Sequence, residues 1–296
     1  MPDAPELLVI GSVALDTRDG PFGKVDEELG GSAVYFALAA SLIVPVAVSA
    51  PVGRDGAEQV TRAFEGRPID TSFLRVIDAP TYRWKAHQEH GHNLDLGSVD
   101  RIYDRWEPEI PPDFAGWAFI GSMRPDRQDM AIKTLHAARL LAADAMLSYV
   151  KVQTLEARNV LRRTAWYFCN HEEFAALGGS DPEEFRRQWW LEGLVLKAGP
   201  KGVTAHTADG NVHVPALPNH PAFDTTGAGD AVAGGMLARW LSTGAQRSGL
   251  QDALVCGVAC ASLTIESIGV RGIASATPRL LDARMAEVWE FLRRES

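Results

Sequence analysis

The sequence predicts an α/β fold in which a largely parallel sheet is covered by helices on both faces and carries a small β-sheet lid. Short apolar runs alternate along the chain with segments of helical periodicity, the pattern of parallel strands joined by crossover helices. Two polar segments interrupt this alternation with patches of period-2 pattern. The alternation therefore predicts the main sheet, and its two interruptions predict the lid.

The first strand is predicted at 6–15, where a continuous apolar run with β-branched residues is typical of a buried strand. A hairpin is predicted around Asp209 and Gly210, a dipeptide that favours a tight turn. The other predicted strands lie at about 44–53, 116–123, 140–146, 165–169 and 191–199. The predicted helices lie at about 30–43, 54–66, 126–140, 154–164, 172–177, 228–242, 250–267 and 279–294.

The lid is predicted from residues 16–30 and 81–106, which are polar and read as antiparallel strands outside the main sheet. The alternative is a pair of long surface loops. Long insertions in a compact domain are usually functional or disordered. No linker or internal repeat divides the chain, so residues 1–296 are expected to form a single domain with this lid.

Composition excludes several classes of function. The net charge is −9 and there is no basic block, which argues against nucleic-acid binding. No uninterrupted apolar run reaches the roughly 18–20 residues of a membrane span, and the acidic N-terminus does not resemble a signal peptide. The cysteines Cys169, Cys256 and Cys260 form no disulfide framework or CxxC pair. We therefore expect a cytoplasmic protein with no membrane partner.

The segment DTTGAGDAVAGG, residues 224–235, carries the clearest chemical signal. Gly227, Ala228 and Gly229 precede a segment of helical periodicity, so they lie at a helix N-terminus, where free backbone N–H groups and the helix dipole favour an anion. Asp230 falls in the first turn beside that site. Asp230 either stabilises the helix, because its negative charge interacts favourably with the helix dipole, or acts as a general base that takes a proton from an attacking hydroxyl.

Two other nucleotide-binding motifs do not fit the sequence. The Walker A pattern GxxxxGK[ST] is absent. The dinucleotide fingerprint GxGxxG fails because Val232 stands at the last glycine position and no buried strand precedes the loop. An NAD-type oxidoreductase is therefore disfavoured.

The segment DTTGAGDAVAGG resembles the C-terminal signature of the ribokinase-like (PfkB-type) carbohydrate kinases, which include nucleoside kinases. Other segments resemble further motifs of that family in the family's order and span nearly the whole chain. They are LGGSAVYFALAASLI (29–43), VGRDG (52–56), NHEE (170–173) and KAGPKGV (197–203). The resemblance implies a Rossmann-like α/β/α sandwich with a small β lid, in agreement with the pattern of strands and helices.

The resemblance also implies roles for residues near the phosphates. Asp230 would be the general base, and Gly227, Ala228 and Gly229 would supply the anion hole. Asn170 and Glu173 would order the nucleotide phosphates and Mg²⁺, largely through water, with Glu173 as the metal-linked carboxylate. A helix cap is the alternative for these two residues.

Further roles implied by the resemblance concern the substrate, the nucleotide and a cation. Asp16 would bind sugar hydroxyls, with Gly30, Gly31 and Ser32 beside it; a turn is the alternative. Lys197, Gly199 and Gly202 would contact the nucleotide. Asp224 and Thr226 match positions near a monovalent-cation (K⁺) site of some members.

This sequence departs from the family pattern at three positions. Lys197 replaces a usual threonine, where it could reach a phosphate or remain in solvent. Ala14 and Ser32 replace asparagines that are common in ribokinases, which argues against ribose as the substrate. In the lid, Tyr82 or Trp84 could stack on a nucleobase or another planar group, although packing within the lid or in a dimer is the alternative. The lid histidines His87, His90 and His92 could form a metal cluster, but in a polar segment solvated side chains are the expectation.

The sequence therefore predicts an ATP- and Mg²⁺-dependent phosphotransferase that phosphorylates a hydroxyl of a small sugar, with Asp230 as general base. The alternatives are a nucleoside kinase of the same fold and a sugar- or nucleotide-binding protein without turnover. Exposed strand edges in the lid make a homodimer through the lid an additional expectation.

Overall fold

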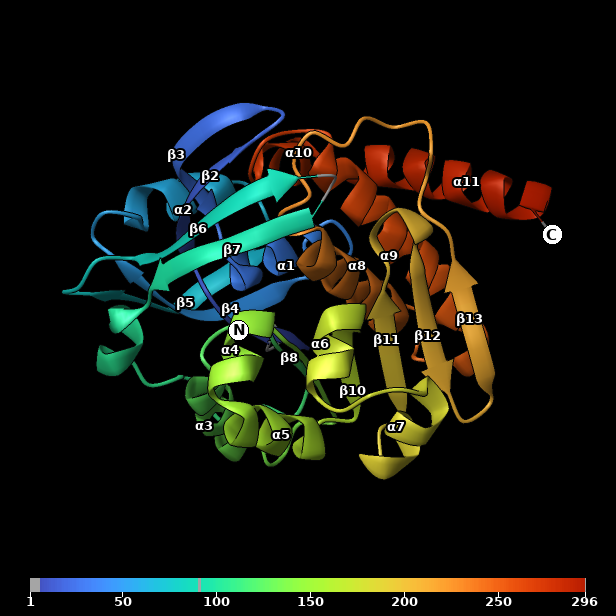
Figure 1. The fold of residues 1–296 in the computed structure, drawn as a ribbon, viewed down its shortest axis with the longest axis horizontal. Coiled ribbons are helices and arrows are strands. Elements are labelled where there is room, and N and C mark those ends of the chain that lie inside the picture. Colours follow the sequence, from blue (N-terminus) through green and yellow to red (C-terminus); the bar gives the residue numbers. More distant parts are fainter. Residues whose placement is uncertain (1–5, 90–91, 296) are drawn as a thin grey trace.

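The structure, a computed structural model, describes residues 6–89 and 92–295. Within that part of the chain, nine strands form one sheet in the order β13-β12-β11-β10-β9-β8-β1-β4-β5, and four form a second sheet in the order β3-β2-β6-β7. The second sheet lies across one end of the main sheet, beside α1 and α8 (Figure 1). The predicted α/β fold with a separate β lid is confirmed, and the alternative of two long surface loops is wrong.

The main sheet is parallel from β5 to β11 and ends in the predicted antiparallel hairpin, β12 and β13. Its strands are β1 (Leu7–Ile10), β4 (Val46–Gly53), β5 (Ile69–Ile77), β8 (Trp117–Ile120), β9 (Leu140–Asp144), β10 (Trp166–Asn170), β11 (Gly193–Lys197), β12 (Val203–Thr207) and β13 (Gly210–Val214). The lid strands are β2 (Ala14–Gly20), β3 (Gly23–Gly30), β6 (Tyr82–Glu89) and β7 (His92–Val99).

Two hydrophobic clusters lie on opposite faces of the main sheet. Leu7 and Val9 of β1 belong to one cluster, and Leu8 and Ile10 to the other, as the alternation of side chains along a strand requires. The first is covered by α1 (Ser32–Ala40), α2 (Ala57–Phe64), α8 (Ala228–Ser242), α9 (Leu250–Ile265), α10 (Arg271–Ser275) and α11 (Pro278–Glu295). The second is covered by α3 (Pro125–Thr134), α4 (Leu147–Val152), α5 (Thr154–Arg163), α6 (His171–Ala176) and α7 (Pro182–Gln188).

The helical segment Arg247–Ile265 is long and apolar enough to cross a membrane by length and composition. In the fold, most of this segment is buried, and α9 packs against α8 within the first cluster. Cys256 and Cys260 are buried on it without a disulfide. This apolar helix is therefore a core element.

The predicted strand at 6–15 is wrong as a single element. β1 ends at Ile10, and β2 begins at Ala14 in the other sheet. Between them Ser12 and Ser32 exchange hydrogen bonds, with Ser12 N donating to Ser32 Oγ at 3.1 Å and Ser32 N donating to Ser12 Oγ at 2.9 Å. The chain therefore changes sheets at the start of α1, a contact across 20 residues that the apolar run does not indicate.

The lid also differs in detail from the prediction. β2 and β6 pair in parallel, whereas the pairs β2–β3 and β6–β7 are antiparallel as expected. The segment 101–106 is not a strand, because Arg101–Arg105 forms a 3-10 helix that buries Ile102 and Tyr103 in the second cluster. The sequence-based prediction also missed β5, α4, α7 and α10.

Candidate active site

The loop before α8 requires its first glycine. Gly227 has φ 75°, in the left-handed region, and an added Cβ would lie 2.3 Å from the ring of Tyr35. Helix α8 begins at Ala228, where its prediction placed it. Ala228 N donates to Thr225 O at 3.3 Å and Ala231 N donates to Gly227 O at 2.9 Å, whereas the N–H groups of Gly229 and Asp230 between them have no backbone acceptor in the described part of the chain. The loop therefore presents backbone donors at a helix N-terminus.

Asp230 lies half-buried in the first turn of α8. Its Oδ1 atom is buried and has no hydrogen-bond partner among the described residues. Burial raises the pKa of Asp230, the charge of Asp144 raises it further, and Lys197 opposes the shift. A carboxylate with a free buried oxygen and a raised pKa can accept a proton from a hydroxyl.

Three adjacent strands end beside this loop with polar side chains. Asp144 ends β9, Asn170 ends β10 and Lys197 ends β11, and Asn170 pairs with Lys197 in the strand register. Lys197 Nζ donates to the two carboxylate oxygens of Asp144 at 2.7 and 2.5 Å. An added Cβ at Gly229 would lie 3.0 Å from Lys197 Nζ. The lysine ammonium therefore lies directly over the glycine loop, bound by a buried carboxylate.

Lys197 keeps its charge at this position. Burial lowers its pKa, but the charges of Asp144 and Glu173 and the hydrogen bond to Asp144 outweigh burial and raise it. The Lys197 side chain is only 16% exposed, so the alternative of a lysine in solvent is wrong, and its contact with a phosphate stays a prediction.

The NHEE segment forms a capping box at the start of α6. Asn170 Oδ1 accepts from the backbone N–H groups of Glu172 and Glu173, both at 2.9 Å, and Glu173 Oε2 accepts from Asn170 N at 2.8 Å. Glu173 is buried; burial raises its pKa, Asp144 and Asp230 raise it further, and Lys197 opposes them. Asn170 and Glu173 therefore do form a helix cap. The cap leaves Glu173 near Asp144 and Lys197, the same charged groups that act on Asp230.

Gly199 and Gly202 follow β11, beyond Lys197. Gly199 is exposed. An added Cβ at Gly202 would lie 2.2 Å from the carbonyl oxygen of Val214, so hairpin packing already explains this glycine. The structure places both near the edge of the sheet but gives neither a distinct contact with the site.

Asp16 lies on the inner face of the lid, on β2. It is 2% exposed, and its Oδ1 has no hydrogen-bond partner among the described residues. Burial raises its pKa to about 7, Arg18 opposes this shift, and Asp224 and Glu28 add to it. The charge of Asp16 in turn raises the pKa of Asp230, so the two carboxylates face the same region.

The residues beside Asp16 are closely packed. An added Cβ at Gly30 would lie 2.3 Å from Asp16 Oδ2, and Gly31 is the N-cap of α1. Ser32 Oγ donates to Ser122 O at 2.9 Å and accepts from Ser12 N. Gly30 therefore makes room for the carboxylate, while the Ser32 hydroxyl is engaged in holding the sheet-to-lid junction.

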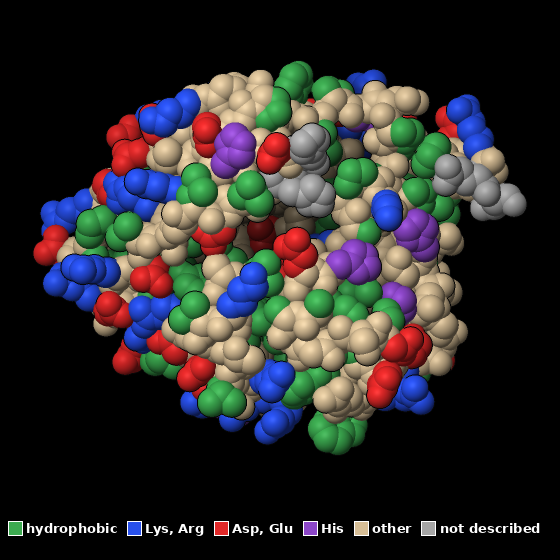
Figure 2. Space-filling model, viewed as in Figure 1, with side chains coloured by type: hydrophobic (Ala, Val, Ile, Leu, Met, Phe, Trp, Pro, Cys, Tyr) green, Lys and Arg blue, Asp and Glu red, His purple; other side chains and the backbone are tan. Residues whose placement is uncertain are grey.

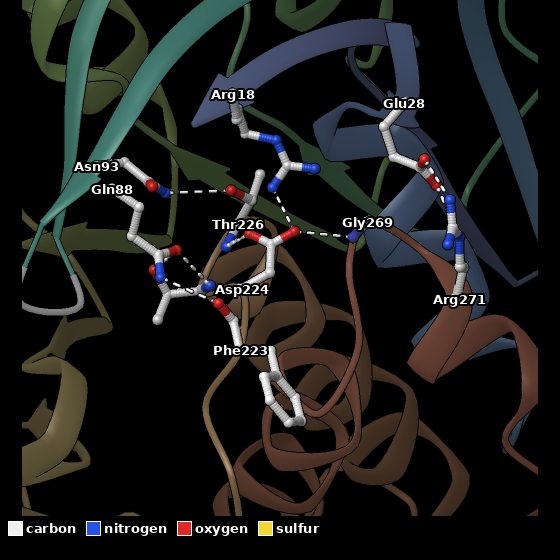
Figure 3. Close-up of polar contacts among 10 residues, drawn as sticks. Arg18, Glu28, Gln88, Asn93, Phe223, Asp224, Thr226, Gly269 and Arg271 are labelled. Atoms are coloured by element: carbon white, nitrogen blue, oxygen red, sulfur yellow. Dashed lines mark hydrogen bonds and ion pairs between the residues drawn. The ribbon is translucent and has the colours of Figure 1, made fainter. Parts of the chain in front are cut away.

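Three lid residues on this face were missed by the sequence-based prediction. Arg18 forms a buried ion pair with Asp224; Gln88 Nε2 donates to Phe223 O at 3.1 Å; and Asn93 Nδ2 donates to Thr226 Oγ1 at 3.2 Å (Figure 3). Arg18 is two residues from Asp16 on β2, so strand alternation could have placed both on one face. Their partners on the glycine loop could not be foreseen from local pattern.

Trp84 is paired with Asp16 in the β2–β6 register and is half-buried on the same face. Its indole N–H is buried without a partner among the described residues. Tyr82 instead packs in the second cluster, with its ring centre 5.8 Å from that of Tyr103. Trp84 also packs against this cluster, so both lid aromatics are partly engaged in the core, and Trp84 differs in having a buried N–H group without a partner among the described residues.

The remaining motif residues serve the lid framework. Thr81 N and Oγ1 donate to Asp55 Oδ1 at 3.0 and 2.6 Å, which fixes the VGRDG segment to the start of β6. His87 Nδ1 lies 3.1 Å from Asp19 Oδ1 at the lid surface. His90 and the His92 side chain lie outside the described residues. Within the described ranges no group of three or more His, Cys, Asp and Glu side chains could hold a metal ion.

The space-filling view shows a hollow between the lid and the helices below it, with acidic side chains inside and at its rim (Figure 2). Sheet edge, glycine loop and lid together present backbone donors, a lysine and free carboxylate oxygens. The fold and this arrangement define a phosphotransferase that acts on a hydroxyl group.

Comparison with known proteins agrees with that class. Residues 13–277 match the model of the pfkB family of carbohydrate kinases. The chain belongs to this family, and the predicted ATP-dependent carbohydrate kinase, a phosphotransferase with a hydroxyl acceptor, is confirmed at the level of the family.

Two curated relatives are kinases named for different acceptors. The chain is 29% identical over 248 residues to a cytidine kinase from Thermococcus kodakarensis, with 79% of this chain and 87% of the relative covered. It is 28% identical over 258 residues to an ATP-dependent ribose-1-phosphate kinase from Halopiger xanaduensis, with 83% of each covered.

Solved structures share the fold at low identity, which confirms the predicted ribokinase-like architecture. A nucleoside kinase from Burkholderia thailandensis in complex with inosine has a TM-score of 0.79 at 18% identity, covering 96% of this chain and 99% of that one. A putative ribokinase from E. coli with ATP and Mg²⁺ has a TM-score of 0.76 at 15% identity (96% and 100% covered). A double-mutant fructokinase from Vibrio cholerae with fructose, ADP and a potassium ion has a TM-score of 0.77 at 18% identity (96% and 100% covered).

Proposed function

We propose that this chain transfers the γ-phosphoryl group of ATP to a hydroxyl of a small sugar, with Asp230 as the general base. The observation that carries the proposal is the free, buried Oδ1 of Asp230 beside the glycine loop, in the same region as Asp16. Asp230 takes the proton as the hydroxyl oxygen bonds to the γ-phosphorus, and the bond to the β-phosphate oxygen breaks to leave ADP. The loop N–H groups and Lys197 stabilise charge on the transferring group.

The lid side of the site suits an acceptor with several hydroxyls. Buried polar atoms that lack partners among the described residues gather on the inner face of the lid. The acceptors are Asp16 Oδ1 and Asn93 Oδ1, and the donors are Arg18 Nε, Arg18 Nη2 and Trp84 Nε1. Buried polar groups normally have partners, so such a set is matched by a ligand that both donates and accepts. Gly30 lets Asp16 approach, with Gly31 and Ser32 forming the junction below it.

The sheet edge suits the nucleotide. Lys197 would leave Asp144 for a phosphate oxygen, and Asn170 and Glu173 lie at the neighbouring strand end, with Gly199 and Gly202 beyond. Mg²⁺ prefers few carboxylates and several waters. Glu173 fits a water-mediated contact because its Oε2 is used by the cap. When bound, the ion would neutralise phosphate charge.

A nucleoside is the second candidate acceptor, and Trp84 is the observation that favours it. Its indole ring is half-buried in register with Asp16, so a base attached to the sugar could stack on it. The relative named for cytidine and the structure with inosine are consistent with such an acceptor.

Three further parts of the proposal concern the protein as a whole. We propose that the chain acts as one kinase domain with its lid, and that it works in the cytoplasm, consistent with three buried cysteines that form no disulfide. A homodimer through the lid is supported by exposed apolar side chains on the edge strand β7, Leu94 and Leu96.

The test is ADP release with ATP and Mg²⁺ across a panel of pentoses, hexoses, keto-sugar acids, sugar phosphates and nucleosides, with Asp230→Asn as the matched blank. We expect one acceptor class to raise ADP release and the variant to lower turnover by about 10²–10⁴-fold. Near-normal turnover in Asp230→Asn would reject the base. A signal confined to nucleosides, and lost in Trp84→Leu, would select the second candidate.

A further inference from the structure

Asp224 is a buried carboxylate whose oxygens are all engaged by N–H donors. It is 1% exposed. Thr226 N donates to Oδ1 at 3.0 Å, Gly269 N donates to Oδ2 at 2.8 Å, and Arg18 Nη1 donates to Oδ2 in the buried ion pair (Figure 3). A buried carboxylate needs a counter-charge, and here a lid arginine of the same chain supplies it.

The same residues were expected to lie near a monovalent-cation site, and a fructokinase of the same fold has been solved with a potassium ion. A cation needs oxygen lone pairs directed at one point. Here the Thr226 hydroxyl also accepts a hydrogen bond, from Asn93 Nδ2. The groups that contact the Asp224 carboxylate, Thr226 N, Gly269 N and Arg18 Nη1, are all donors. A guanidinium already lies against this carboxylate, so a second positive charge there would be repelled. The residues present do not fit K⁺ at this carboxylate.

We propose that the Arg18 guanidinium is a built-in cation that replaces a monovalent metal ion behind the glycine loop. Asp224 lies three residues before Gly227 and six before Asp230, so its ion pair fixes the loop that carries the base. Arg18 lies on β2, two residues from Asp16. The lid therefore carries both Asp16, which would bind the acceptor, and Arg18, whose charge orders the loop. A change in the position of the lid would consequently change the order of the glycine loop. This inference rests on the proposed function only where turnover is the measurement.

The first test needs no activity. Thermal unfolding of the full chain is followed in KCl, NaCl and choline chloride at equal ionic strength. We expect the wild type to show the same unfolding temperature in all three salts. A stabilisation specific to K⁺ would overturn the proposal, and this holds even if the chain phosphorylates none of the acceptors tried.

The second test removes the guanidinium with Arg18→Ala and uses Arg271→Gln as the matched control. Arg271 lies two residues after Gly269 and pairs with Glu28 of the lid, with its side chain 65% exposed. We expect Arg18→Ala to lose about 10- to 100-fold in turnover and to regain stability and turnover with K⁺ or guanidinium, but not with choline. Arg271→Gln should respond to none of these ions.

A third variant keeps the proposal testable if Arg18→Ala does not fold. Arg18→Lys retains a positive charge, so it should fold and remain indifferent to K⁺. A lysine variant that requires K⁺ for stability, or an alanine variant with unchanged stability and turnover in choline chloride, would overturn the assignment.

Discussion

Two buried pairs of a basic and an acidic residue flank the glycine loop, and they differ in what they connect. Lys197 and Asp144 both stand on strand ends of the main sheet, so their pair stays within one rigid element. Arg18 and Asp224 stand on the lid and on the loop, so their pair joins two elements that are far apart in sequence. In the Lys197–Asp144 pair, the lysine can bind a phosphate in place of the carboxylate without a movement of the backbone. The Arg18–Asp224 pair can form only when the lid lies against the loop.

The largest effect is expected from breaking the pair on the sheet edge. Lys197→Met leaves the Asp144 carboxylate buried and unpaired, since the Asp144 side chain is only 3% exposed. The free energy of unfolding should fall by about 3–5 kcal/mol in urea titrations. The control is Lys133→Met, which removes a lysine exposed at the surface; we expect a change within about 0.5 kcal/mol.

A double variant separates stability from catalysis at this pair. Asp144→Leu with Lys197→Met removes both charges and should regain much of the lost stability. Turnover should stay low if Lys197 contacts the transferring phosphoryl group. Recovery of turnover together with stability would show that the lysine serves only to neutralise Asp144.

A smaller effect is expected on the lid, where the protonation of Asp16 should make the stability of the chain depend on pH. The pKa of Asp16 is about 7 in the fold, above its usual value of 3.8. The folded chain therefore holds a proton that the unfolded chain has lost between about pH 4 and 7, so stability falls as pH rises through this interval. Asp16→Asn removes this contribution and should flatten the profile by about 1–3 kcal/mol, measured by urea unfolding from pH 5 to 8.

Asp19→Asn is the control for that pH profile, because Asp19 is on the same strand but exposed. It should leave the slope of stability against pH unchanged. Identical slopes in the wild type and Asp16→Asn would mean that Asp16 is ionised in the fold throughout this range. The raised pKa of Glu173 acts in the same direction, so some slope should persist in the Asp16→Asn variant.

The sequence predicted what local pattern encodes. The helix after Gly227, the hairpin around Asp209 and the strands of the main sheet from β8 to β11 follow from periodicity and turn residues. The sheet-edge residues Asn170 and Lys197 came from motifs at strand ends, and the structure brings them together because parallel strands end at one edge.

The rest depends on contacts between distant segments. Arg18 meets Asp224 across 206 residues, and Gln88 and Asn93 meet the same loop across more than 130. No periodicity specifies such partners. The prediction of a single strand over 6–15 failed for the same reason. The Ser12–Ser32 hydrogen bonds at the point where the chain enters the lid join residues that are far apart in sequence.

The smallest effect concerns Asn170, where a structural and a functional role coincide. Asn170→Ala removes the cap of α6 and should cost about 1 kcal/mol of stability, whereas Asn170→Ser keeps an acceptor at the cap and should cost less. Both substitutions remove the side-chain amide that the nucleotide would meet. If the residue also orders the phosphates, the serine variant should fold normally yet need more Mg²⁺–ATP for half-maximal ADP release. A serine variant with wild-type stability and an unchanged requirement for Mg²⁺–ATP would make Asn170 a helix cap only, and the sheet edge would then act on the nucleotide through Lys197 and Glu173.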